Sequence, residues 1–319
     1  MRVIITGGTG LIGSALARKL AQNGDEVIVL SRHPSQHRSD LPRGVTAVEW
    51  DAHSSKGWEH LAEGAGAIVN LAGSNIATWP WSESNKRSFL MSRLNAGKAV
   101  SEAVEKAQVK PQVVIQSSGI DYYEGRRDDE PVDENTPPGH DFLSNLSVGW
   151  EKSTQSVEAL GVRRAIIRTG LVLARQSGAL PKLALPFRFF VGGPMGSGRQ
   201  VYSRIHLEDE VRAIRFLIEN ETASGPFNLT APNALPEREF ADVLGKVLGR
   251  PSWLPVPGLP VRLVLGEMAV TVLRGRRVIP EKLLELGFEF KYPDLESALA
   301  EIYGSRQGEV LTAESERRT

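Results

Sequence analysis

The sequence predicts an α/β protein with a doubly wound parallel sheet and a smaller C-terminal α/β lobe. Short apolar, β-branched runs alternate with segments of helical periodicity through the first half of the chain, which is typical of a parallel sheet with helices on both faces. The first run leads at once into a glycine-rich turn and a helix. The expected strands of this half cover residues 3–5, 26–30, 46–49, 67–71, 113–117 and 164–168, and its later helices cover 91–107 and 150–160.

The composition changes beyond residue 172. Glycine and proline become frequent, above all in 180–199, which predicts loops and short helices of a lobe that covers the cofactor side of the sheet. We therefore expect one domain at 1–172 and a substrate-side lobe at 173–304, with a helical extension from about 250 and a disordered tail at 305–319. The elements expected in this half are helices at 207–219, 236–248, 261–273 and 280–286 and a strand at 225–229.

Composition excludes several classes of function. The 38 basic and 38 acidic residues of this 319-residue chain balance, which argues against nucleic acid or an anionic membrane as the main partner. Because there is no cysteine, disulfides and thiol catalysis are excluded, and the scattered histidines lack metal-ligand spacing, so no metal site is expected. The chain does not open with a signal-peptide pattern, so a cytoplasmic location is expected.

The most informative motif is the turn after the first strand, Gly7-Gly8-Thr9-Gly10-Leu11-Ile12-Gly13. Glycines let a backbone approach a pyrophosphate closely, and a helix N-terminus offers free N–H groups and a positive dipole. Strand, glycine turn and helix together predict the dinucleotide site of a Rossmann sheet. The residues expected to contact the cofactor here are Gly7, Thr9, Gly10, Leu11, Ile12 and Gly13.

The end of the second strand indicates which dinucleotide is bound. Sites for NAD carry an acidic residue there that repels a 2′-phosphate, whereas this chain has Ser31 and Arg32. Arg32 can donate to a phosphate and stack on adenine, so the pattern predicts NADP(H). Asp51 is expected either to accept from the adenine amino group or to cap a helix. The small residues of Leu71-Ala72-Gly73 let the backbone run beside the ribose and pyrophosphate.

Motifs from both halves of the chain carry a family resemblance. They are Gly7–Gly13, Asn70–Gly73, Ile167–Gly170, Ile205–Asp209, Ser92–Leu94, Tyr122–Tyr123, Asp141–Leu143, Trp150–Glu151, Gly192–Pro194, Gly196–Gly198 and Arg276–Pro280. Together they resemble the extended short-chain dehydrogenases/reductases, and more narrowly the atypical "epimerase family protein" branch that includes human family 39U. The resemblance implies an NAD(P)-binding Rossmann fold, a small C-terminal helical extension and a cofactor contact for Arg93.

The catalytic part of the pattern departs from these relatives. Their Tyr-x-x-x-Lys pair uses the tyrosine as acid or base and the lysine to lower its pKa. In the corresponding helix, Ser147 takes the tyrosine position if Glu151 takes that of the lysine, and Val148 takes it if Lys152 does. The resemblance places Gly119 where a catalytic serine is expected, with Ser118 one residue away. On a helix, Glu151 and Lys152 are expected to form a solvated charged pair.

Three interpretations of function stay open. The protein is an oxidoreductase or epimerase-like enzyme with another proton donor, or a dinucleotide-binding sensor or scaffold, or it runs a chemistry that needs only a bound nicotinamide. The candidates for catalysis are Tyr122, Tyr123 and Ser118, although paired tyrosines also serve as packing residues. A small-molecule substrate is expected, with an anionic group that Arg199 can meet. A homodimer is also open, and His206 is expected to order the second lobe.

Overall fold

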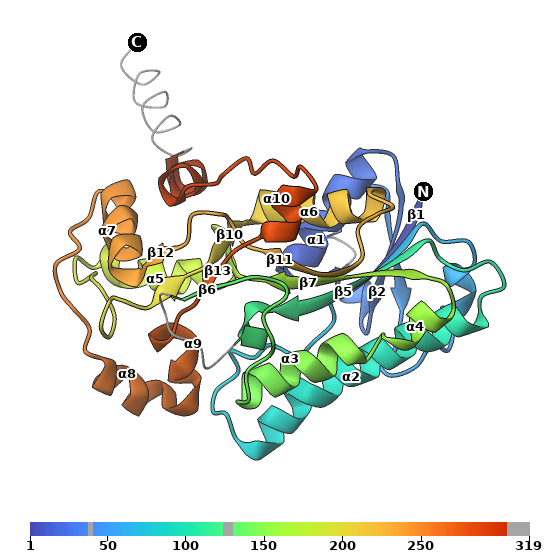
Figure 1. The fold of residues 1–319 in the computed structure, drawn as a ribbon, viewed down its shortest axis with the longest axis horizontal. Helices are drawn as coiled ribbons and strands as arrows, with labels where there is room; N and C mark the ends of the chain where they lie inside the picture. Colours follow the sequence, from blue (N-terminus) through green and yellow to red (C-terminus); the bar gives the residue numbers. More distant parts are fainter. Residues whose placement is uncertain (38–40, 124–129, 305–319) are drawn as a thin grey trace, which may run out of the picture.

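A computed structural model describes residues 1–37, 41–123 and 130–304. Its centre is a seven-stranded sheet in the order β11-β7-β5-β4-β1-β2-β3, in which all neighbours are parallel (Figure 1). The strand order reverses between β1 and β4, which creates the crevice of a doubly wound sheet. The strands are β1 (Arg2–Thr6), β2 (Glu26–Ser31), β3 (Val45–Glu49), β4 (Ala67–Asn70), β5 (Val113–Gly119), β7 (Arg163–Thr169) and β11 (Gly225–Leu229). The predicted α/β fold class is confirmed.

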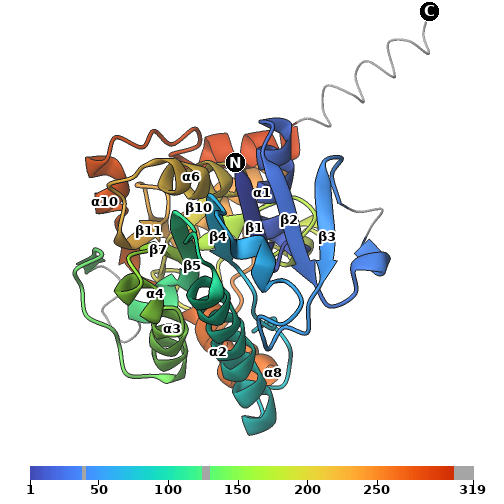
Figure 2. The same ribbon diagram turned by 90° about the vertical axis from the view of Figure 1, so that its right-hand side faces the viewer.

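Helices cover both faces of this sheet, so its strands are buried on both sides. Alternate residues of β1 show the two layers: Val3 and Ile5 pack with α1 (Leu11–Gln22) and α6 (Leu207–Glu219). Ile4 packs on the opposite side with α2 (Glu83–Lys106). Figure 2 shows α1 and α6 above the sheet and α2 and α3 below it. Burial on both faces explains why the strands read as continuous apolar runs.

Two helices of the first half differ from the prediction. α2 begins at Glu83 rather than 91, because Ser82 caps it by accepting from Asn85 N. The helix predicted at 150–160 is wrong. The chain instead forms α3 (Phe142–Lys152), capped by Asp141, then a turn, then the short α4 (Ser156–Ala159).

The sheet also recruits residues from beyond the predicted domain boundary at 172. Both α6 and β11 follow that boundary in sequence, yet α6 packs on the sheet and β11 pairs with β7. Arg163 of β7 links the end of α6 to the segment before β11. Its guanidinium donates to the carbonyls of Leu217, Ile218 and Ala223 at 2.8–2.9 Å. The division into two domains stays a prediction. Any second lobe after residue 172 is interrupted in sequence by α6 and β11, which belong to the central sheet and its helical layer.

The other elements form the lobe and the C-terminal extension. Leu180, Phe240 and Leu299 belong to a separate small core. The longer helices are α5 (Leu180–Arg188), α7 (Glu237–Leu248), α8 (Gly258–Leu265) and residues 295–304. The short elements are β6 (Pro131–Val132), β8 (Leu171–Leu173), β9 (Val201–Tyr202), β10 (Arg204–His206), β12 (Leu235–Pro236), β13 (Arg277–Val278), α9 (Val270–Leu273), α10 (Glu281–Glu285) and the 3-10 turns η1 (Pro34–His37), η2 (Glu59–Ala62), η3 (Ile120–Tyr123) and η4 (Gly266–Ala269).

The extension returns to the Rossmann layer. Gly266, with φ +57°, divides the predicted 261–273 helix into α8, η4 and α9. Glu267 of η4 then forms an ion pair with Lys86 of α2 at 2.6 Å. Met268 and Val270 pack against a cluster that contains residues of α2 and α3. Within the described residues, no helix is long and apolar enough to cross a membrane.

Candidate active site

The glycine turn between β1 and α1 is too tight for side chains. Gly7 has φ +68°, and a Cβ there would lie 2.8 Å from the carbonyl carbon of Leu71. A Cβ on Gly8 would lie 2.6 Å from the methyl groups of Val29, and one on Gly13 would overlap the carbonyl oxygen of Gly7. The turn therefore packs directly against β2 and the end of β4, which explains the glycines at these positions.

The N-terminus of α1 opens at the carboxyl edge of the sheet. Its N-cap is Gly10, no side chain caps it, and its first turn contains no acidic residue. The first backbone N–H groups of a helix have no intrahelical partner, and the helix dipole makes this end positive. This end is thus suited to a phosphate, as predicted from the motif.

A buried polar ladder aligns the strand ends beside this turn. Thr6 Oγ1 donates to Asn70 Oδ1 at 2.7 Å, and Asn70 Nδ2 donates to Gln116 Oε1 at 2.9 Å. Thr6 Oγ1 also accepts from the backbone N–H of Ala72 at 3.2 Å. The ladder crosses β1, β4 and β5 and holds the 71–73 segment against the glycine turn, where the cofactor backbone was predicted to run.

At the end of β2 the structure leaves a cation exposed. Ser31 is buried and its Oγ accepts from His33 N at 3.2 Å, whereas Arg32 is exposed and has no ion pair among the residues described. Asp51 caps a turn: its carboxylate accepts from His53 N at 2.7 Å and from the Ser54 N–H and hydroxyl. It caps no helix, and its predicted adenine contact stays a prediction.

Arg93 lies beneath the segment that follows β4. It is only 7% exposed, and a Cβ on Gly73 would lie 3.0 Å from its Cζ. Its Nη1 donates to the carbonyls of Ser74 and Phe89, and its guanidinium lies 4.6 Å from the centre of the Trp150 ring. Its Nε has no hydrogen-bond partner. Burial lowers the Arg93 pKa to about 10, so it remains charged at neutral pH.

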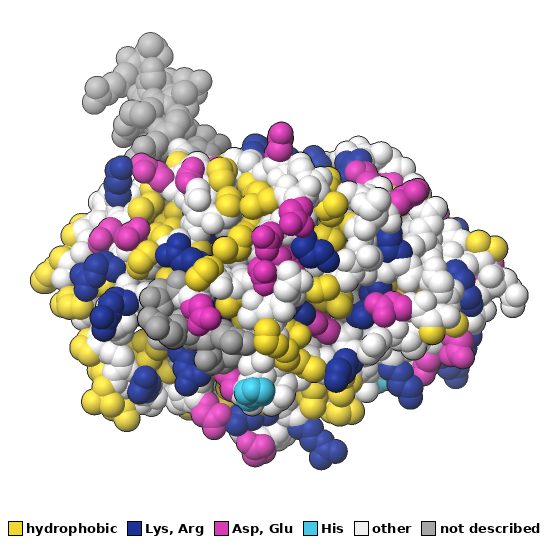
Figure 3. Space-filling model, viewed as in Figure 1, with side chains coloured by type: hydrophobic (Ala, Val, Ile, Leu, Met, Phe, Trp, Pro, Cys, Tyr) yellow, Lys and Arg dark blue, Asp and Glu magenta, His cyan; other side chains and the backbone are white. Residues whose placement is uncertain are grey.

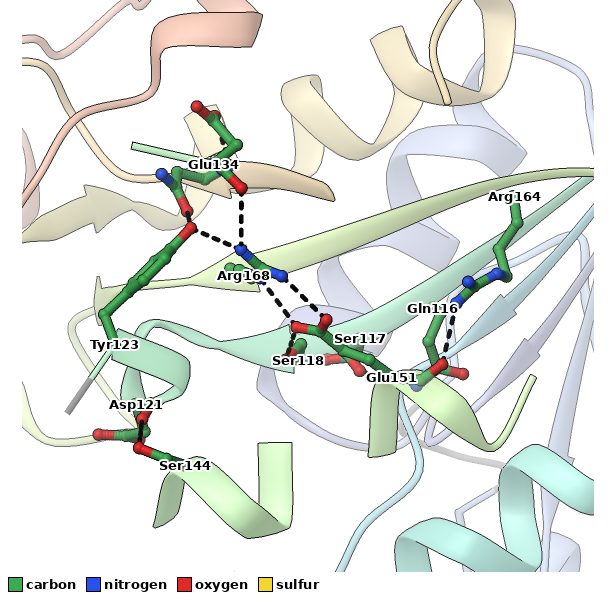
Figure 4. A network of polar contacts seen from close by, with 11 residues as sticks. Gln116, Ser117, Ser118, Asp121, Tyr123, Glu134, Ser144, Glu151, Arg164 and Arg168 are labelled. Atoms are coloured by element: carbon green, nitrogen blue, oxygen red, sulfur yellow. Dashed lines mark hydrogen bonds and ion pairs between the residues drawn. The ribbon is translucent and has the colours of Figure 1, made fainter. Parts of the chain in front are cut away.

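A second buried cation has a full set of partners. Arg168 of β7 holds Glu151 of α3 through two bonds, Nε–Oε1 at 2.8 Å and Nη2–Oε2 at 3.0 Å (Figure 4). Ser118 Oγ donates to the same Oε1 at 2.8 Å. Although burial opposes it, the hydrogen bonds and charge of Glu151 hold the pKa of Arg168 above its ordinary value. The expectation of a solvated Glu151 is wrong, because α3 turns this residue toward the sheet while Lys152 faces solvent.

The two adjacent tyrosines have different environments. Tyr123 is 0% exposed; its hydroxyl donates to Asn228 Oδ1 at 2.8 Å and accepts from Arg168 Nη1 at 2.7 Å. Burial raises the Tyr123 pKa in spite of Arg168, and its role as a proton donor stays a prediction. Tyr122 is partly exposed, and the Arg168 guanidinium lies 3.5 Å from the centre of its ring. Tyr122 is thus the accessible one of the pair.

Ser118 and Ser147 are also withdrawn from solvent. Ser118 is buried with its hydroxyl on Glu151, and its role as a catalytic residue stays a prediction. Ser147 is 2% exposed on α3. Arg199 is exposed beside the 196–198 turn, and its contact with an anionic substrate stays a prediction. His206 caps α6 by accepting from Glu208 N at 3.2 Å, which fits the structural role expected for it.

The C-terminal extension contributes a residue that sequence analysis did not select. Arg276 Nη1 forms an ion pair with Asp121 Oδ1 at 2.9 Å, next to Tyr122 at the carboxyl end of β5. Its carbonyl accepts from Ser203 Oγ at 2.7 Å, and the following β13 pairs with β6. The pairing spans 155 residues, and only the Arg276–Pro280 motif pointed toward this segment.

Glu210 was missed as well. It is completely buried in α6, accepts from Thr169 Oγ1 at 2.7 Å, and its Oε2 has no partner. Burial raises the Glu210 pKa to about 8. Thr169 ends β7 beside Gly119 of β5, so this uncompensated carboxyl group lies behind the same edge of the sheet. Helical periodicity gave no signal for it, since Glu210 follows Glu208 and Asp209 in an apparently solvated run.

Comparison with known proteins places this geometry in a family. Residues 3–144 match the NAD dependent epimerase/dehydratase family, and residues 256–302 match a domain of unknown function, DUF1731. Epimerase family protein YfhF of Bacillus subtilis is 36% identical over 307 residues, which cover 96% of this chain and 99% of that protein. The chain belongs to the epimerase family. The resemblance drawn from its motifs is confirmed.

Other members and solved structures agree with this assignment. Epimerase family protein SAR0825 of Staphylococcus aureus is 36% identical over 94% of this chain and 98% of that protein. The structure of human epimerase family protein SDR39U1 with NADPH is 34% identical, with a TM-score of 0.82 over 95% of this chain and 99% of that one. A Corynebacterium glutamicum nucleoside-diphosphate sugar epimerase is 28% identical, with a TM-score of 0.76 over 98% of this chain and 61% of that one.

Proposed function

We propose that this epimerase family member binds NADP(H) along the carboxyl edge of its sheet and acts as an oxidoreductase or epimerase-like enzyme on a small molecule. The observation that carries the proposal is the pairing of an open α1 N-terminus, behind a turn that admits only glycine, with an exposed Arg32 at the end of β2. The human relative SDR39U1 was solved with NADPH, which supports the same choice here.

The residues present fit this cofactor from end to end. The Gly7–Gly13 turn and the α1 N-terminus suit the pyrophosphate, and Ser31 with Arg32 suit a 2′-phosphate, because neither residue is acidic and Arg32 is exposed. The Leu71–Gly73 segment, held by the Thr6 ladder, would line the ribose. Arg93 lies directly behind this segment, and its Nε–H has no hydrogen-bond partner, so this cation can donate to a cofactor oxygen.

The proton-transfer groups differ from the usual pair of the wider family. No tyrosine is present in α3, and Glu151, at the position matched to the lysine, is neutralised by Arg168. When bound, a nicotinamide ring supplies or accepts a hydride. Tyr122 would then hold the accompanying proton, because it is the accessible phenol at the carboxyl end of β5. The Arg168 guanidinium lies 3.5 Å from the centre of its ring.

A second candidate function is a dinucleotide-binding sensor or scaffold without turnover. One observation favours it: the side chains of Ser118, Glu151 and Tyr123 are all hydrogen-bonded to Arg168 or to one of its partners. A cluster so saturated stabilises the fold and leaves few groups for substrate. This candidate keeps the same cofactor site and removes only the role of Tyr122.

A turnover screen separates the two candidates. The full chain would be mixed with NADPH and with aldehydes, quinones and sugar nucleotides in turn, and NADPH binding would be titrated in parallel. Turnover that falls in Tyr122→Phe supports the enzyme. Tight NADPH binding without turnover on any substrate class supports the sensor or scaffold, and absence of NADPH binding contradicts both.

A further inference from the structure

A cluster of exposed aromatic side chains lies in the C-terminal lobe. Phe189 is 69% exposed, Phe190 54% and Trp253 64%, and Val191 and Leu254 beside them are also exposed. We define these five residues as the aromatic patch. Exposed apolar residues grouped in this way mark interaction sites more often than scattered ones do.

The aromatic patch is one surface although it comes from two segments. The indole Nε1 of Trp253 donates to the carbonyl of Phe190 at 3.0 Å. The backbone N–H groups of Trp253 and Leu254 both donate to the carbonyl of Gly192 at 3.1 Å. The loop after α5 and the loop after α7 are thus joined by hydrogen bonds, and their side chains project together.

Local backbone strain supports a functional role for this surface. Phe190 has φ +63°, a region that bulky residues rarely occupy. The strained backbone holds a phenyl ring that remains more than half exposed, so burial of this ring in the fold does not compensate for it. Strain of this kind persists where a surrounding structure holds a residue for another purpose.

The two segments that carry the aromatic patch are themselves basic, although acidic residues of α7 and Glu267 adjoin them in the chain. Segments 180–203 and 249–266, which carry it, contain no Asp or Glu and hold Lys182, Arg188, Arg199, Arg250 and Arg262. The guanidinium of Arg250 lies 4.6 Å from the centre of the Phe190 ring. On the left-hand side of Figure 3, hydrophobic side chains and Lys or Arg side chains lie close together. The patch thus combines apolar rings with basic groups.

We propose that the aromatic patch docks this protein on the surface of an anionic lipid bilayer. Exposed Trp and Phe side chains enter the interfacial region of a bilayer, and neighbouring Arg and Lys side chains bind anionic headgroups. A second copy of the chain fits less well, because a two-fold interface centred on the patch would bring Arg188 and Arg250 of the two copies together.

The test is co-sedimentation of the full chain with phosphatidylcholine vesicles, with and without phosphatidylglycerol. We expect binding to the anionic vesicles that weakens with added salt and falls about tenfold in Phe189→Ser/Trp253→Ser and in Arg188→Gln/Arg250→Gln. Leu284→Ser, a change of an exposed leucine on α10, is the matched control and should bind like the unchanged protein. Circular dichroism melting checks that each variant folds.

Two outcomes overturn the proposal. One is that the protein does not sediment with anionic vesicles, or sediments equally well with Phe189→Ser/Trp253→Ser. The other is a dimer in analytical ultracentrifugation that the same double substitution abolishes while vesicle binding is absent, which assigns the patch to a second copy.

Discussion

Glu151 and Arg168 form a buried two-bond ion pair between α3 and β7, with N–O distances of 2.8 and 3.0 Å. Glu151 is one of the two residues, with Lys152, that the motif comparison aligns with the lysine of the wider family, and the pair binds Ser118 and Tyr123 into the same network. Arg93 and Tyr122 form none of these hydrogen bonds, although the Arg168 guanidinium lies 3.5 Å from the centre of the Tyr122 ring, and they are the residues we propose to meet cofactor and substrate.

The ion pair should contribute strongly to stability. Glu151→Gln leaves the buried Arg168 without a counter-charge, and we expect the free energy of unfolding to fall by about 3 kcal/mol in urea titration. Lys152→Gln, an exposed change on the same helix, should alter it by less than about 0.5 kcal/mol. Equal effects of the two substitutions would contradict the buried pair.

Substitution of Tyr122 should affect the reaction rate, and substitution of Tyr123 should affect the stability of the fold. Once a substrate is identified, Tyr122→Phe should lower kcat about tenfold or more with little change in the melting temperature. Tyr123→Phe should lower the unfolding free energy by about 1–3 kcal/mol, since Asn228 and Arg168 lose their partner, and should spare the rate at temperatures where it is folded. Ser147→Ala should retain most of the rate. A rate lost with Ser147 and kept without the Tyr122 hydroxyl would reverse these roles.

Glu210 should make stability depend on pH. Its folded pKa of about 8 lies above the ordinary 4.5, so the folded state binds the extra proton between these values. The contribution is complete below the unfolded pKa and is lost as pH rises through the folded one. Relative to Glu210→Gln, the unchanged protein should therefore lose at least about 1 kcal/mol of unfolding free energy between roughly pH 5 and 8. Melting curves of both proteins across that range check this; parallel pH profiles would refute it. Glu237, whose pKa burial raises to about 7, is present in both and cancels.

The glycine turn gives a test of where the dinucleotide binds. Gly13→Ala adds a methyl group against the Gly7 carbonyl, so we expect NADPH affinity to fall by about tenfold or more while the fold persists. Gly161→Ala provides a control at a glycine with positive φ far from the turn, where nothing lies within 4 Å of the added Cβ. That variant should bind NADPH normally, and normal binding by Gly13→Ala would place the site elsewhere.

Sequence patterns were sufficient for the sheet and for the glycine turn after its first strand. Strands such as β1 and β4 are buried on both faces and so read as apolar runs, and the glycine motif is local. Two features could not be read in this way. β11 was placed correctly in sequence, but its pairing with β7 depends on a crossover that periodicity does not encode. The same holds for Arg276, which reaches Asp121 across 155 residues.

The surroundings of Glu151, Tyr122 and Tyr123 could not be predicted from the sequence, for a different reason. A charged residue on a helix normally faces solvent, so Glu151 gave no sign of its buried partner on β7. Tyr122 and Tyr123 are adjacent and alike in sequence, and only the tertiary packing assigns one to the interior. Family resemblance pointed to this region, and the packing shows which of its side chains are buried.

The most direct test of the account is calorimetric titration of the full chain with NADPH and with NADH, repeated for Arg32→Ala. We predict NADPH binding at micromolar concentration or tighter, with NADH at least about tenfold weaker. Arg32→Ala should weaken NADPH by about 1.5–3 kcal/mol and leave NADH almost unchanged. Arg18→Ala, on the exposed face of α1, should change neither. Equal affinities for the two dinucleotides, or no loss on removal of Arg32, would contradict the account.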